Sequence, residues 1–240
     1  MTFFVGWSAP SARPLAAFLA AVVLALLLGM GGLALALGST VNDPGSGDFT
    51  GDRMLTGVLV TDPYPVIVLD PDPMHPAGHT VLLSGGGKRG VQPEAGPLAG
   101  QRVKAVGYGV KRGTLDMLLV DTIQAEPGDA AIPSTESLGR WRLTGEICDG
   151  KCMLGVMRPG TGLAHKACAN VCVMGGVPPV LVTTAPVAGS RFLLMGDPAG
   201  HALPDGFRDH TAIPQRMDGA VRRLGDLLVF RTDVNAAVDP

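Results

Sequence analysis

Four cysteines and one histidine in a single stretch of 25 residues are the side chains of this sequence best suited to chemistry. They are Cys148, Cys152, His165, Cys168 and Cys172. Thiolates and imidazoles are the ligands that zinc prefers, and thiolates with thioethers suit Cu(I). The sequence therefore predicts that these five residues bind zinc or copper, or that the cysteines are redox-active. Methionines at 153, 157 and 174 add soft sulfur ligands nearby.

The second half of this stretch has the composition of a short helix. Residues 163–173 are rich in alanine and are followed by two glycines and two prolines, which end helices. On such a helix His165, Cys168 and Cys172 stand at i, i+3 and i+7 and share one stripe. One of the two earlier cysteines is expected to arrive from the preceding strand and turn and to complete the ligand set.

Disulfide bonds are an alternative use for the same cysteines. Their number is even, as is typical of domains that fold in an oxidising compartment. The two C-x3-C pairs resemble the twin C-x3-C arrangement, in which two disulfides clip antiparallel segments. This resemblance implies the pairs Cys148–Cys172 and Cys152–Cys168 and a structural role. A third interpretation is a thiol enzyme in which His165 activates Cys168 or Cys172, although the sequence shows no group to orient the imidazole.

Two other motifs are weaker. Residues 85–90 match G-x-G-x-x-G, but that motif needs a helix directly after it to bind a pyrophosphate. Pro93 and Pro97 follow here, so we expect no helix and interpret the stretch as a hairpin loop. Met74, His75 and His79 lie in a proline-rich loop and carry groups that can bind copper. Because ligand type alone is a weak argument, we interpret them as ordinary loop residues.

An apolar segment near the N-terminus, residues 15–37, contains no charged side chain. At ~1.5 Å per residue it reaches about 34 Å, enough to cross a hydrocarbon core of ~30 Å. Arg13 precedes it, whereas the first basic residue after it is Arg53, and this Lys/Arg asymmetry favours a cytoplasmic segment 1–14. The sequence thus predicts a single-pass protein of the inner (plasma) membrane with most of the chain periplasmic or otherwise extracytoplasmic. A cleaved signal peptide is the alternative.

After a linker at 38–52, short apolar runs separated by glycine and proline indicate antiparallel β-strands. A second linker at 126–138 divides these runs into modules 53–125 and 139–236. Gly57 follows a threonine in the first module as Gly145 does in the second, and similar hairpins end both, so the halves look alike.

About five strands in each half suit a small closed barrel. We therefore predict a mainly β chain with an N-terminal transmembrane helix and two antiparallel barrels. They resemble the OB-fold in strand number and length; an immunoglobulin-like sandwich is the alternative. The second barrel carries a helical Cys/His insertion at 148–179, in which the run 152–157 is expected to be a strand.

Charge and motifs narrow the function. The net charge of −2 gives no indication of nucleic-acid binding. No complete catalytic motif is present, so we lean away from an enzyme. We expect an accessory protein that holds a metal or redox-active cysteines, in partnership with a respiratory or transport complex of the membrane. The alternatives are a structural interaction module with two disulfides and a thiol-dependent enzyme.

Overall fold

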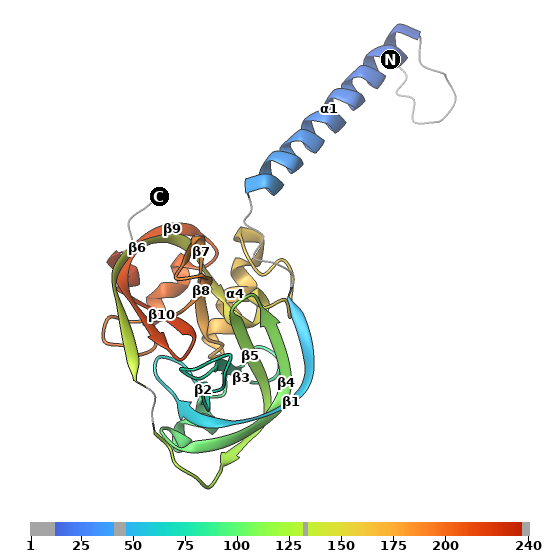
Figure 1. Ribbon diagram of the computed structural model, residues 1–240. Helices are drawn as coiled ribbons and strands as arrows, with labels where there is room; N and C mark the ends of the chain where they lie inside the picture. Colours follow the sequence, from blue (N-terminus) through green and yellow to red (C-terminus); the bar gives the residue numbers. More distant parts are fainter. Residues whose placement is uncertain (1–12, 41–46, 132–133, 237–240) are drawn as a thin grey trace. The chain divides into compact units, whose positions relative to one another are not determined.

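A computed structural model describes residues 13–40, 47–131 and 134–236 of the 240-residue chain (Figure 1). The chain divides into two compact units, Met1–Asp43 and Pro44–Pro240. The first unit contains helix α1, Arg13–Thr40, which covers the predicted segment 15–37. Its leucines and alanines favour a helix, and the side chains from Arg13 to Ala36 are exposed. This helix is long and apolar enough to cross a membrane, a property that signal sequences share.

The second unit contains two closed five-stranded barrels. The strands of the first barrel are β1 (Asp48–Val60), β2 (Val66–Leu69), β3 (Thr80–Ser84), β4 (Arg102–Arg112) and β5 (Leu115–Ala125). Between β3 and β4 lie helix α2 (Gln92–Ala95) and the 3-10 turn η1 (Gly96–Leu98). Strand β1 therefore begins within the stretch 38–52 that was predicted to be a linker.

The strands of the second barrel are β6 (Thr135–Asp149), β7 (Pro179–Val187), β8 (Ser190–Gly196), β9 (Pro214–Leu224) and β10 (Leu227–Thr232). Helices α3 (Gly150–Met153) and α4 (Lys166–Met174) and the 3-10 turn η2 (Leu163–His165) lie between β6 and β7. Two further 3-10 turns, η3 (Asp205–His210) and η4 (Val234–Ala236), follow β8 and β10.

Both barrels close in the same order, because β1-β2-β3-β5-β4 corresponds strand for strand to β6-β7-β8-β10-β9. Four of the five pairings in each ring are antiparallel, whereas β3 with β5 and β8 with β10 are parallel. The prediction of purely antiparallel barrels was wrong in this respect. An odd number of strands cannot alternate in direction around a closed ring, so one parallel pair is required.

Four clusters of buried residues lie in the described part of this unit, three large ones and a small one formed by Cys152, Cys172 and Val177. One large cluster fills the first barrel around Leu59 and Leu118, and another fills the second around Ile147 and Phe230. The third joins the two barrels, because buried residues of both take part in it, among them Met117 from β5. The barrels therefore pack on each other through an apolar surface, which removes it from water.

Candidate metal centre

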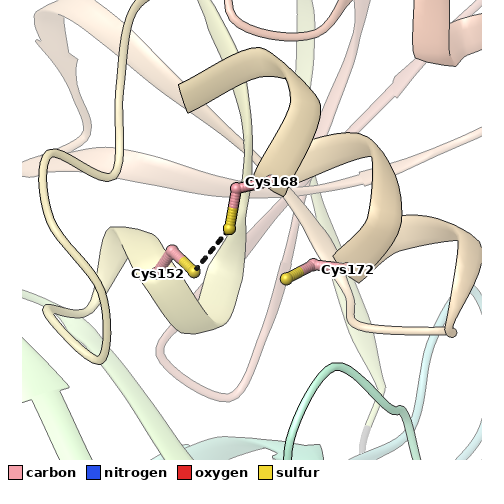
Figure 2. A group of neighbouring side chains, drawn as sticks. All are labelled: Cys152, Cys168 and Cys172. Carbon is pink, nitrogen blue, oxygen red and sulfur yellow. Dashed lines mark hydrogen bonds between the residues drawn. The ribbon is translucent and has the colours of Figure 1, made fainter. Parts of the chain in front are cut away.

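Three cysteines meet between helices α3 and α4. The Sγ atoms of Cys152, Cys168 and Cys172 all lie within 4.8 Å of one another, and those of Cys152 and Cys168 are 4.0 Å apart. Figure 2 shows the three thiols directed into the space between the two helices, Cys152 from α3 and the other two from α4. All four cysteines of the chain are free thiols. Of the predicted stripe of His165, Cys168 and Cys172, the two cysteines lie on α4, whereas His165 ends the 3-10 turn η2 before it.

Helix α3 places Cys152 because Asp149 caps it. The Asp149 carboxylate accepts a hydrogen bond from the backbone N–H of Cys152 at 2.8 Å, which satisfies an amide at the start of the helix. The prediction of a strand at 152–157 was therefore wrong. A strand would send alternate side chains to opposite faces, whereas this turn directs Cys152 toward α4.

His165 does not join the three thiols as a group. Its Nε2 atom lies 2.8 Å from the Asp149 carboxylate, and both side chains are almost completely buried. His165, Asp149 and Cys152 form a second group of neighbouring polar atoms. Asp149 thus orients the imidazole and holds Cys152 at the same time.

Cys148 lies outside both groups in the described part of the chain. Its thiol is 3.3 Å from Glu146 Oε1, and it is buried in the apolar cluster between the barrels. Burial raises the pKa of the Cys148 thiol well above its usual value. Of the five predicted site residues, the structure therefore gathers three and places His165 beside Cys152 alone. The predicted disulfide pair Cys152–Cys168 joins neighbours, but neither predicted disulfide is formed.

Two further side chains complete the surroundings of the thiols. The Lys88 ammonium, from the first barrel, lies 2.8 Å from Cys168 Sγ and 3.8 Å from Cys172 Sγ. The Met157 thioether lies 3.3 Å from Cys168 Sγ. Met157 was visible from its position in the sequence, but Lys88 is 80 residues from Cys168 and no local spacing indicates it.

The glycine-rich loop at 85–90 positions Lys88. Its backbone carbonyls at Gly85, Gly87 and Arg89 accept hydrogen bonds from the buried ammonium of Lys151, with N···O distances of 2.7 Å to Gly87 and 3.5 Å to Arg89. The Gly90 amide donates to the Gly175 carbonyl at the end of α4. The loop therefore holds a cation with its carbonyls, the opposite of a loop that binds phosphate with its amides.

The loop is also not a hairpin, because it leads into helix α2. The expectation that no helix follows it was wrong. Pro93 stands in the first turn of α2, where its missing N–H has no intrahelical partner to lose. The four residues of α2 are nevertheless too few for the dinucleotide-binding arrangement.

Charge is distributed unevenly among the thiols. The pKa of Cys172 is lowered, chiefly because the Cys152 thiol donates a hydrogen bond to it, and Lys88 adds to the effect. The same hydrogen bond raises the pKa of Cys152. The hydrogen bond to Cys168 raises the pKa of Lys88, which stays a cation. The site is thus a set of three soft sulfur atoms that begins to ionise at Cys172 and is faced by a fixed positive charge.

The comparisons with known proteins give no further assignment, since no protein-family model, no curated protein and no solved structure matches this chain.

Proposed function

We propose that this chain is a membrane-anchored, extracytoplasmic accessory protein that binds one thiophilic metal ion through Cys152, Cys168 and Cys172. The single observation that carries the proposal is the convergence of these three thiols, from two helices, to within 4.8 Å of one another. Copper(I) or zinc is the ion, and a respiratory or transport complex of the membrane is the partner that it serves.

The ligand set favours copper(I) over zinc. Structural zinc sites are almost always tetrahedral with four thiolate, imidazole or carboxylate ligands, whereas only three thiols converge here among the described residues. The nearby Met157 thioether is a ligand type that suits Cu(I). His165, the expected nitrogen ligand, lies in a separate group with Asp149 and Cys152 and does not join the three thiols. Lys88 offsets part of the negative charge that three thiolates would bring to a singly charged ion.

Helix α1 supports the anchoring in the membrane. Arg13 precedes the apolar segment and the next basic residue is Arg53, and this Lys/Arg asymmetry supports an extracytoplasmic position for the barrels. The five strands of each barrel and the parallel pair that closes the ring support an OB-like classification. Neither argument depends on the metal.

A redox pair, Cys152 with Cys168, is the second candidate. Their sulfur atoms, 4.0 Å apart, would need to approach to about 2.05 Å, with two electrons and two protons passing to a disulfide or quinone oxidant. The buried His165–Asp149 pair beside Cys152 supplies the oriented imidazole that thiol chemistry at this residue requires.

The test is a metal and thiol count on the full chain, purified in detergent without oxygen, reductant or chelator. We expect four thiols under denaturing conditions and about one equivalent of copper or zinc. Cys168→Ser and Cys172→Ser should lose this metal. Cys148→Ser is the matched control, because this cysteine lies outside the group of three, and it should keep the metal.

Three results would separate the candidates. A metal-free protein with two thiols and one Cys152–Cys168 disulfide supports the redox pair and overturns the metal proposal. Four thiols without metal, after incubation with Cu(I) or Zn²⁺, overturns it as well. Equal loss of metal from the Cys148→Ser variant shows that the ion is bound elsewhere and overturns the assignment of ligands.

A further inference from the structure

A second group of side chains that can bind a metal is shared by the two barrels. His75 and His79 belong to the loop between β2 and β3 of the first barrel, and Asp226 belongs to the turn between β9 and β10 of the second. One ligand atom from each lies within 4.8 Å of the other two. The two imidazole rings are 4.7 Å apart between centroids.

Each histidine turns one ring nitrogen toward Asp226, Nδ1 in His79 and Nε2 in His75. His79 Nδ1 lies 2.6 Å from Asp226 Oδ2, and His75 Nε2 lies 3.9 Å from the same oxygen. Asp226 is itself oriented, because its other oxygen accepts a hydrogen bond from the backbone N–H of Thr80. Three potential ligands from two loops therefore converge on one point.

Each histidine also has a carboxylate on its opposite nitrogen. His79 Nε2 lies 2.9 Å from Asp116, which Arg53 fixes in place at 2.7 Å. His75 Nδ1 lies 3.1 Å from Asp72. Metal-bound histidines characteristically donate their second N–H to a carboxylate, which fixes the tautomer and strengthens the ligand nitrogen. This arrangement occurs twice here, and in both cases the remaining nitrogen faces Asp226.

We infer that His75, His79 and Asp226 bind a divalent cation of the zinc class, separately from the three cysteines. Nitrogen and oxygen ligands at about 2.0–2.2 Å around a tetrahedral ion stand roughly 3.3 Å from one another. The observed separations of 2.6 and 3.9 Å lie on either side of this value, so small opposite movements would admit the ion. His75 and Asp226 also line a cavity of about 330 Å³, which leaves room for water as the fourth ligand.

The carboxylates of Asp226 and Asp116 lie on the two ring nitrogens of His79, at 2.6 and 2.9 Å. They place negative charge beside the position that a bound cation would occupy. With the cation bound, the two barrels are joined by coordination bonds as well as by apolar contact.

Co²⁺ added to the full chain in detergent, purified without a polyhistidine tag, tests this site as a substitute for zinc. The His–Asp site should give only weak d–d absorption bands, whereas any Co²⁺ at the cysteines adds intense thiolate-to-cobalt charge transfer. His75→Gln and Asp226→Asn should lose one equivalent and weaken binding by at least the roughly 10–100-fold that loss of an outer-sphere partner costs. Because Co²⁺ bound to thiolates also gives d–d bands, all variants are compared in the Cys168→Ser background, where the remaining d–d bands belong to the His–Asp site.

The control is His201→Gln, since this exposed histidine lies beside Asp197 and outside the cluster. It should keep full Co²⁺ binding. Absence of the d–d bands in the Cys168→Ser chain overturns the inference without any further variant. It is also overturned if the bands persist in both His75→Gln and Asp226→Asn, or if His201→Gln removes them equally.

Discussion

The two barrels have the same strand order but differ in which connection is long. In the first barrel the link from β1 to β2 spans only 61–65, and the long loop at 70–79 joins β2 to β3. In the second barrel the link between the corresponding first strands, 150–178, is long, and the next is a tight turn at 188–189. One long loop carries the histidines and the other the cysteines, so the repeated scaffold is constant while its connections have diverged.

Each long loop is completed by the other barrel. Lys88 of the first barrel contacts the thiols of the second, and Asp226 of the second contacts His79 of the first. The cysteine group of the second barrel and the histidine group of the first therefore each need a residue from the other barrel. Substitutions at equivalent positions of the two barrels, or on one side of a contact between them, test this dependence. The largest expected loss of stability comes first.

The largest difference between the barrels is expected at Asp149 and its counterpart Thr61, each four residues after the glycine of the Thr-Gly pair. Asp149→Ala leaves His165 buried without its partner and removes the cap of α3, so the free energy of unfolding should fall by about 3–5 kcal/mol. Thr61→Ala should cost less than about 1 kcal/mol. Chemical denaturation measures both, and equal losses would show that the two positions are not specialised differently.

The next effect is expected at the contact of Lys151 with the glycine-rich loop. Lys151→Met leaves the buried Gly85 carbonyl and the more exposed Gly87 carbonyl without this donor and should lower the free energy of unfolding by about 1–3 kcal/mol. Because this loop carries Lys88, the metal affinity of the thiols should fall as well. Lys111→Met, at an exposed position of β4, is the matched control and should lie within about 0.5 kcal/mol of wild type. A neutral Lys151→Met would mean that the loop does not depend on the second barrel.

The smallest effect is expected from removal of residues 1–43. The remaining residues form their own compact unit, and Gly47, against Leu154, is retained. The fragment 44–240 should unfold in one transition at the same denaturant concentration as the full chain in detergent. Two transitions would contradict the dependence of each barrel on the other.

The general fold could be predicted from the sequence because its signals are local. The uncharged run at 15–37 has the length of a membrane-spanning helix, and the spacing of the later apolar runs indicates strands. The parallel pairs β3–β5 and β8–β10 could not be read from these runs, because they follow from closure of the ring. The short helix α3 was missed because one side-chain cap at Asp149 decides between a helix and a strand there.

The candidate site was predictable only where it is local. Cys168 and Cys172 share a helix, so their relation follows from helical period, and Cys152 was among the expected ligands. The exclusion of Cys148 from the group of three depends on the exact end of β6 and the burial of its thiol. Lys88 and Asp226 come from the opposite barrels, and only tertiary packing brings them to the thiols and to the histidines.

The apolar cluster shared by the two barrels makes the two halves of the chain dependent on each other. Since neither half can bury this surface alone, each barrel needs the other to remove its share of the surface from water. A chain broken between Ala125 and Thr135 would keep its two pieces together, and either piece alone would aggregate. A substitution on one side of this shared apolar surface therefore changes the packing of both barrels.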